Sequence, residues 1–217
     1  MPGTTKWVYA FSEGDGRNKM LLGGKGANLC EMTRIGLPVP PGFTVTTEAC
    51  LAYLRENRLP DGLMDQVKAH LKAVEQATGK GFGAARNPLL VSVRSGSAMS
   101  MPGMMDTILN LGLNPQTIQG LIRQSGNERF VYDANRRFIM MFSDVVLGVD
   151  KHKFEAIFDE HKKLKGYTQD GDLTTEDLKR ICAEFLALVQ IETGHGFPAD
   201  PWRQLELAVE AVFRSWN

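Results

Sequence analysis

The spacing of apolar residues changes near residue 112, and this change limits what the chain can fold into. Before that point, short apolar runs predict strands at 7–11, 43–46, 89–94 and 107–111, and helical spacing predicts helices at 26–35, 47–56 and 63–74. After residue 113 the apolar stripes all have the period of a helix. The sequence therefore predicts an α+β fold with a mixed first part and a helical second part.

Capping residues mark where several of these helices begin. Thr47 is predicted to cap the helix through Glu56, and Asn114-Pro115 is a good N-cap and first-turn pair. Thr174 and Asp177 have the spacing of a capping box, with Asp in place of the usual Glu or Gln.

Charge and cysteine content exclude several classes of protein. The 217 residues hold 25 Lys and Arg against 25 Asp and Glu, so the chain lacks the broad positive field that binds nucleic acid without sequence preference. No apolar run approaches the roughly 20 residues of a membrane span, and the N-terminus lacks the apolar core of a secretory signal. Cys30, Cys50 and Cys182 lack CxxC spacing and are expected to be buried free thiols. We expect a cytoplasmic protein that binds neither nucleic acid nor membrane.

A glycine turn is the sharpest local feature. The stretch LLGGKG at 21–26 stands directly before the predicted helix 26–35. Glycines let the backbone approach an anion, a helix start offers unpaired N–H groups, and Lys25 adds a positive charge. The run is neither a P-loop nor GxGxxG. Taken alone, a surface turn is the commoner interpretation of such a run.

A second cation stands at the end of a predicted strand. Arg94 closes the apolar run 89–93 and precedes Ser95-Gly96-Ser97. An arginine at a strand end can bind phosphate oxygens through two hydrogen bonds, and an ion pair is the alternative. The stretch 97–107 that follows is rich in methionine, and it either fills gaps in the core or forms a pliable loop over a ligand.

The histidines do not predict a metal site. His70, His152, His161 and His195 show neither HxxxH nor HExxH spacing. His70 is expected to be a core histidine whose hydrogen bonds are satisfied. The basic segment 151–165 is best explained as a solvated helix face.

Together these segments resemble the pyruvate, phosphate dikinase family over essentially the whole chain. The matching stretches are KWVYAF, LLGGKGANLCEM, GLPVPPGFTVTTEAC, NPLLVSVRSGSAMSMPGMMDTILNLGLN, RFVYDANRRFIMMFSDVV and AVFRSWN. The resemblance implies a truncated ATP-grasp nucleotide-binding domain. Its α/β N-terminal subdomain would be 1–113, its inserted helical subdomain 114–197, and 198–217 a helix that returns to the first subdomain.

The resemblance also implies which residues bind the nucleotide. Lys25 and Arg94 match the family's phosphate-binding lysine and arginine, to which we assign catalytic roles. Gly23 and Gly24 belong to the same turn, and Gly103 and Thr107 match loop positions near the phosphates.

The implied reaction of the family converts ATP, phosphate and pyruvate to AMP, pyrophosphate and phosphoenolpyruvate. A histidine on a separate domain carries the phosphoryl group. The chain lacks the GGxTSH phosphohistidine motif, the pyruvate-binding barrel and the acidic Mg²⁺ ligands. We therefore expect an inactive fragment of an enzyme, with ATP as substrate, Mg²⁺ bound elsewhere in the parent enzyme, and a homodimeric parent. Its partners would be ATP, phosphate and the missing remainder of the ATP-grasp domain together with the phosphohistidine domain.

Two other functions remain open from the sequence. One is a stand-alone, non-catalytic nucleotide-binding or regulatory module on the same scaffold. The other is nucleic-acid binding through 151–165, which the zero net charge and the lack of interleaved aromatic residues disfavour.

Overall fold

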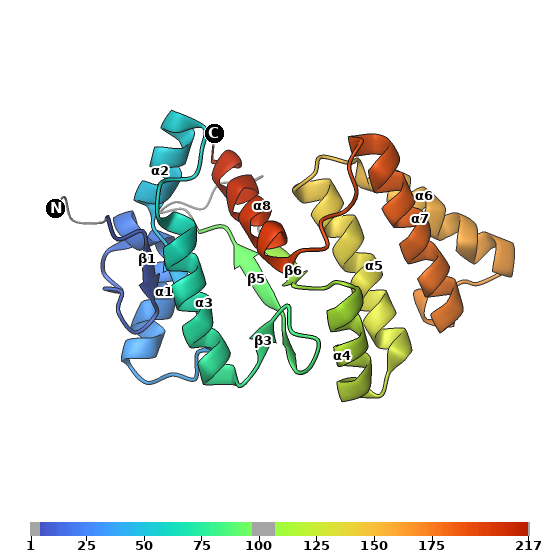
Figure 1. Cartoon of the computed structure of the whole chain (residues 1–217), viewed down its shortest axis with the longest axis horizontal. Coiled ribbons are helices and arrows are strands. Elements are labelled where there is room, and N and C mark those ends of the chain that lie inside the picture. Colours follow the sequence, from blue (N-terminus) through green and yellow to red (C-terminus); the bar gives the residue numbers. More distant parts are fainter. Residues whose placement is uncertain (1–4, 97–106, 217) are drawn as a thin grey trace. The chain divides into compact units, whose positions relative to one another are not determined.

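The computed structural model of the chain describes residues 5–96 and 107–216. Within them the helices are α1 (Lys19–Arg34), α2 (Thr47–Glu56), α3 (Leu63–Thr78), α4 (Pro115–Ser125), α5 (Glu128–Val145), α6 (Lys151–Lys165), α7 (Thr175–Thr193) and α8 (Pro201–Arg214), with a short 3₁₀ turn η1 (Asp170–Asp172). The strands are β1 (Val8–Ala10), β2 (Phe43–Val45), β3 (Gly81–Phe82), β4 (Pro88–Leu89), β5 (Val91–Arg94) and β6 (Thr107–Leu111). The predicted mixture of helices with short strands is confirmed (Figure 1).

The strands form three separate pairs within the described residues. β1 and β2 are antiparallel, with Tyr9 opposite Thr44, whereas β3 and β4 are parallel, with Phe82 opposite Leu89. The third pair is β5 with β6. The prediction of one strand over 89–94 is therefore wrong, because the two halves of that run, β4 and β5, hydrogen-bond to different neighbours on either side of Leu90.

The chain divides into two compact units. Unit 1 consists of the described parts of Met1–Lys80, Arg94–Thr107 and Val209–Asn217, and unit 2 of Gly81–Val93 and Ile108–Ala208. Unit 1 is thus assembled from three stretches that are distant in the sequence.

In unit 1, helices pack on the β1–β2 pair. α1 contacts β2 and α2, and α3 contacts both strands (Figure 1). The packing of α1 on β2 is close, because a Cβ on Gly26 would lie 2.6 Å from the Cγ2 of Thr44. Val8, Ala27 and Cys30 are fully buried in this part of the molecule.

Unit 2 contains a helical bundle in which α5 contacts α4, α6 and α7 (Figure 1). Its largest fully buried side chains include Phe138, Phe142, Phe154 and Phe185. Phe154 and Phe185 meet edge to face, with ring centroids 4.9 Å apart. The apolar stripes seen in the sequence are therefore the faces that build this core.

The helix caps agree with the sequence in two of three cases. Asn114 and Thr174 each cap a helix, as predicted. Thr174 does so through the predicted capping box, and Asn114 forms a capping box as well. The cap of α2 is Thr46 and not Thr47. Thr46 has an extended backbone and its hydroxyl accepts a hydrogen bond from the N–H of Ala49, while the hydroxyl of Thr47 donates to the carbonyl of Met20.

The three cysteines are free and buried, as predicted. Burial raises the pKa of Cys50 to about 12 and that of Cys182 to about 11. Both thiols are therefore protonated and unreactive at neutral pH.

Candidate functional site

The glycine turn lies at a kink in α1, directly before the main part of that helix, as predicted, but one helical turn precedes it. α1 begins at Lys19, where the side chain of Asn18 accepts a hydrogen bond from the N–H of Leu21. The helix is interrupted at Gly23, whose φ of 69° and ψ of 167° are not helical. These angles fall in a region that is open essentially only to glycine. One helical turn thus precedes the glycine turn, and the main part of the helix follows it.

Gly23 touches the loop that follows β5. A Cβ placed on Gly23 would lie 1.8 Å from the carbonyl oxygen of Gly96. A Cβ placed on Gly96 would lie 3.3 Å from the Cβ of Lys25. A Cβ at position 23 would overlap the backbone of Gly96, so this close approach requires glycine at position 23, whereas a Cβ at position 96 would make only a tight contact with Lys25.

This contact brings the two predicted cations into one region of unit 1. Arg94 is two residues before Gly96 and ends β5, on whose exposed face it lies together with Ser92. Lys25 is also exposed, directly beside Gly96. The chain positions of the two cations are therefore close, with the Cβ of Lys25 beside Gly96 and Arg94 two residues before Gly96.

The other predicted site residues have different positions. Gly24 is half-buried within the glycine turn. Thr107 is the first residue of β6, the strand that pairs with β5, and it is half-buried. Gly103 lies outside the described residues, as does most of the methionine-rich stretch 97–107.

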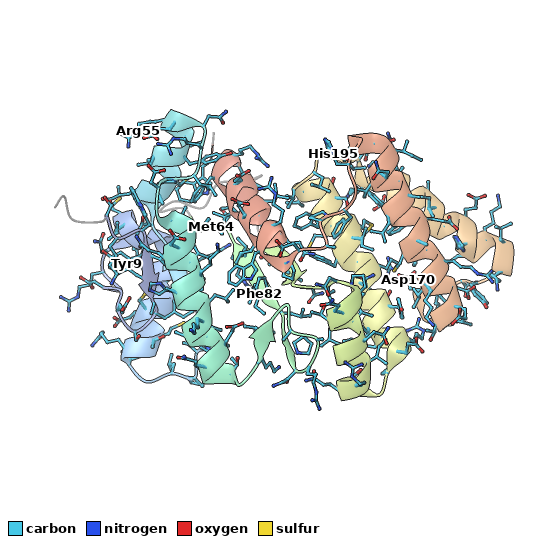
Figure 2. The ribbon with its side chains drawn as sticks, in the orientation of Figure 1. Tyr9, Arg55, Met64, Phe82, Asp170 and His195 are labelled. Carbon is cyan, nitrogen blue, oxygen red and sulfur yellow. The ribbon has the colours of Figure 1, made fainter. Side chains whose placement is uncertain are left out.

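The histidines are dispersed. The Nδ1 of His70 lies 2.8 Å from the carbonyl oxygen of Gln66, and its Nε2 lies 3.5 Å from the carboxylate of Glu13. Figure 2 shows His195 just past the C-terminal end of α7. Over residues 5–96 and 107–216, no three His, Cys, Asp or Glu side chains gather in a metal-binding group.

The basic segment on α6 is largely neutralised by neighbouring acids. Lys153 pairs with Glu192 on α7, Lys162 with Asp159 and Asp170, and Lys165 with Asp177. A helix face whose cations already have carboxylate partners offers little to a phosphate backbone.

A groove in unit 2 was not predicted from the sequence. It has a volume of about 580 Å³ and its lining includes Leu90 and Asn110 together with the α5 residues Phe130, Asp133 and Arg137. Phe130 is 62% exposed, and the Nε of Arg137 lies 3.0 Å from the carboxylate of Asp133. The i, i+4 spacing of Asp133 and Arg137 indicates an ion pair on a helix surface and carries no signal of a groove.

Nearby arginines determine the charge of Asp133. Burial opposes ionisation of this carboxyl, but hydrogen bonds and charge from Arg136 and Arg137 outweigh it and keep its pKa below the ordinary value. The guanidinium of Arg136 also stacks over the ring of Phe158, 4.0 Å from its centroid. This wall of the groove therefore carries compensated charges.

None of the described helices is long and apolar enough to cross a bilayer.

Comparison with known proteins shows which proteins the chain resembles. The family model described as "Pyruvate phosphate dikinase, AMP/ATP-binding domain" matches residues 19–69, the stretch from α1 into α3 that contains the glycine turn and Lys25.

Three curated relatives are similar over almost the whole chain. "Pyruvate, phosphate dikinase" of Entamoeba histolytica is 52% identical over 210 residues, which are 96% of this chain and 24% of the relative. The enzyme of the same name from Clostridium symbiosum is 51% identical over 98% of this chain and 24% of its own length. "Pyruvate, phosphate dikinase 2" of Zea mays is 54% identical over 95% of this chain and 23% of its own length. The chain spans about a quarter of the length of these relatives, and it is similar to proteins named pyruvate, phosphate dikinase over 95–98% of its own length.

Proposed function

We propose that this chain is part of the ATP-binding domain of a pyruvate, phosphate dikinase, and that Lys25 and Arg94 bind the phosphates of ATP. The fold would be an ATP-grasp domain, with an α/β subdomain at 1–113, a helical subdomain at 114–197 and a returning segment at 198–217. Gly23 and Gly24 would shape the turn that faces the phosphates, with Gly103 and Thr107 close to them.

The observation that carries this proposal is the contact between the glycine turn and the loop after β5. Gly23 and Gly96 meet backbone to backbone, and Lys25 and Arg94 flank that contact. Two cations held this way, on a backbone that glycine keeps open, suit a polyphosphate whose charge is spread over several oxygens. The match of residues 19–69 to an AMP/ATP-binding domain supports the same assignment.

The proposed chemistry of the whole enzyme is phosphoryl transfer. ATP, phosphate and pyruvate would become AMP, pyrophosphate and phosphoenolpyruvate, through a histidine on another domain that attacks the β-phosphorus. Such transfer depends mainly on positioning and on stabilising the charge that develops on the phosphate oxygens. Lys25 and Arg94 would supply that charge stabilisation at the β- and γ-phosphates.

Mg²⁺ would neutralise further phosphate charge in the complete enzyme. The described residues hold no group of three carboxylate, histidine or cysteine side chains that fits such an ion, so we assign none of them as its ligands.

We also infer that this chain alone does not complete the reaction, because it spans only 24% of the length of a relative with the whole activity in its name. Given ATP, phosphate and pyruvate, a full-length relative should form AMP, whereas this chain should form none.

Binding measurements with charge-removing variants test the assignment of the two cations. We expect Arg94→Ala and Lys25→Ala each to raise the Kd for ATP by roughly 10-fold or more, as the loss of a charge-assisted hydrogen bond of about 1.5–3 kcal/mol implies. Isothermal titration calorimetry measures this Kd.

Matched controls come from the same unit. Arg55, labelled in Figure 2, and Lys72 are exposed on α2 and α3. Their alanine variants should leave the Kd unchanged. Equal affinity in all four variants and the wild type would remove Lys25 and Arg94 from the phosphate site. In a full-length relative, replacing the arginine that matches Arg94 with alanine should abolish the formation of AMP and pyrophosphate.

A further inference from the structure

A buried serine separates the proposed phosphate-binding arginine from the glycine contact. Ser95 follows Arg94 and precedes Gly96, and it is only 3% exposed. Its hydroxyl oxygen accepts a hydrogen bond of 3.1 Å from the indole Nε1 of Trp216. A residue near the end of the chain thus holds the middle of this three-residue segment.

The position of Trp216 is fixed by the last part of α8, which belongs to unit 1. The backbone N–H of Trp216 donates to the carbonyl of Phe213, and Phe213 is buried with 5% exposure. The ring of Phe213 lies 5.5 Å from that of Tyr53, and its carbonyl accepts from the thiol of Cys50 at 3.8 Å. Both of these partners are on α2, so the end of α8 is anchored on that helix.

The same helix also contacts the segment before the glycine turn. The hydroxyl of Thr47, in the first turn of α2, donates to the carbonyl of Met20, in the first turn of α1. These contacts form a closed circuit. It runs from α1 to α2, from α2 to the end of α8, and from Trp216 to Ser95, and the contact of Gly96 with Gly23 returns it to α1.

We propose that Trp216 is a positioning residue for the phosphate site. Through its hydrogen bond to Ser95 it holds the carbonyl of Gly96 against Gly23, and so keeps the segment that carries Arg94 against the turn that carries Lys25. Its effect on ligand binding rests on the proposed function of those two cations. Its effect on the backbone contact does not.

The indole N–H can be removed while the aromatic packing is largely kept. Trp216→Phe is the test variant, and Trp7→Phe is its matched control. Trp7 belongs to the same unit and donates a similar hydrogen bond of 3.2 Å from its Nε1, but to the carbonyl of Asp61, away from the glycine turn.

Amide hydrogen exchange in the absence of ligand tests whether the hydrogen bond from Trp216 to Ser95 holds the contact between Gly23 and Gly96. We expect exchange in 21–26 and 91–96 to rise about fivefold in Trp216→Phe, the factor that corresponds to one neutral hydrogen bond of about 1 kcal/mol. Exchange in α3 should be unchanged, and Trp7→Phe should leave 21–26 and 91–96 as in the wild type. Unchanged exchange of both segments in Trp216→Phe would overturn the proposal.

Substitutions of Ser95 separate a positioning role from a general loss of structure. Ser95→Ala should raise amide hydrogen exchange as Trp216→Phe does. Ser95→Thr, which keeps the hydroxyl, should show wild-type amide hydrogen exchange. The double variant Ser95→Ala with Trp216→Phe should be no worse than either single variant, because both remove one shared bond. Additive effects would show that the two residues act separately and would refute the proposal.

Titration with sodium tripolyphosphate then connects the contact to the site. If the wild type binds tripolyphosphate and Arg94→Ala does not, Trp216→Phe should bind it about fivefold more weakly than the wild type. Wild-type affinity in Trp216→Phe would overturn the positioning role and leave the proposed function intact. If neither ATP nor tripolyphosphate binds the wild type, the proposed function fails, and the exchange measurement still decides the role of Trp216.

Discussion

Replacing Gly23 with alanine should destabilise unit 1 for two separable reasons. The first is conformational, because φ of 69° with ψ of 167° costs a residue with a Cβ about 1–3 kcal/mol. The second is steric, since the new Cβ would lie 1.8 Å from the Gly96 oxygen, whereas ordinary contact begins at 3.4 Å. That oxygen belongs to backbone, so no rotamer change relieves the overlap.

The steric cost of this substitution follows from the distance that must be recovered. The two segments would have to separate by about 1.6 Å, and forced displacements of this kind cost about 1–3 kcal/mol. We expect Gly23→Ala to lower the free energy of unfolding by about 3 kcal/mol or more. For a chain of this size that corresponds to a fall in Tm of roughly 6–12 °C.

Gly36→Ala is the matched control for the conformational contribution. Gly36 has a φ of 80°, but no atom lies within 4 Å of the Cβ it would gain. It should therefore show a backbone cost alone, of about 1–2 kcal/mol. Urea unfolding followed by circular dichroism and tryptophan fluorescence measures both variants. Equal loss of stability in the two would refute the inference that contact with Gly96 keeps position 23 a glycine.

Two further predictions concern titrating groups. The pKa of the Asp177 carboxyl is held below its ordinary value by hydrogen bonds from the hydroxyl and the backbone N–H of Thr174 and by Lys165. The stability that the ionised carboxylate contributes is therefore complete above about pH 4. It is lost as the pH falls through the lower pKa of the folded state. The difference in urea midpoint between the wild type and Asp177→Asn should thus be largest near neutral pH and shrink below about pH 4, and a difference that did not vary with pH would contradict this. Because Cys30, Cys50 and Cys182 are buried, Ellman's reagent at about pH 8 should label them slowly in the native chain and completely in denaturant. Rapid labelling of Cys50 or Cys182 in the native chain would show that these sites open readily.

Local features of the sequence determined much of the helical structure. The caps at Asn114 and Thr174 and the apolar stripes of α5 and α7 could be predicted because a helix is held together by residues three and four positions apart. The burial of the free cysteines followed from their helical surroundings in the same way. The glycine turn and Arg94 were recognisable as chemical groups, but nothing local placed one beside the other.

The tertiary structure decided the features that depend on residues distant in the sequence. Thr46 and Thr47 have the same capping chemistry, and here the hydroxyl of Thr47 bonds to Met20 while that of Thr46 caps the helix. The apolar run through Leu90 changes partner between β4 and β5 because two different strands lie beside it.

The contact of Gly23 with Gly96 and the bond of Trp216 to Ser95 also exist only in the folded unit. Their partners come from three separate stretches of the chain, which meet only when the core of unit 1 assembles. Sequence spacing carries no information about such meetings. The sequence by itself therefore determined which groups are available, and the packing of α1, α2 and the end of α8 determined which of them meet.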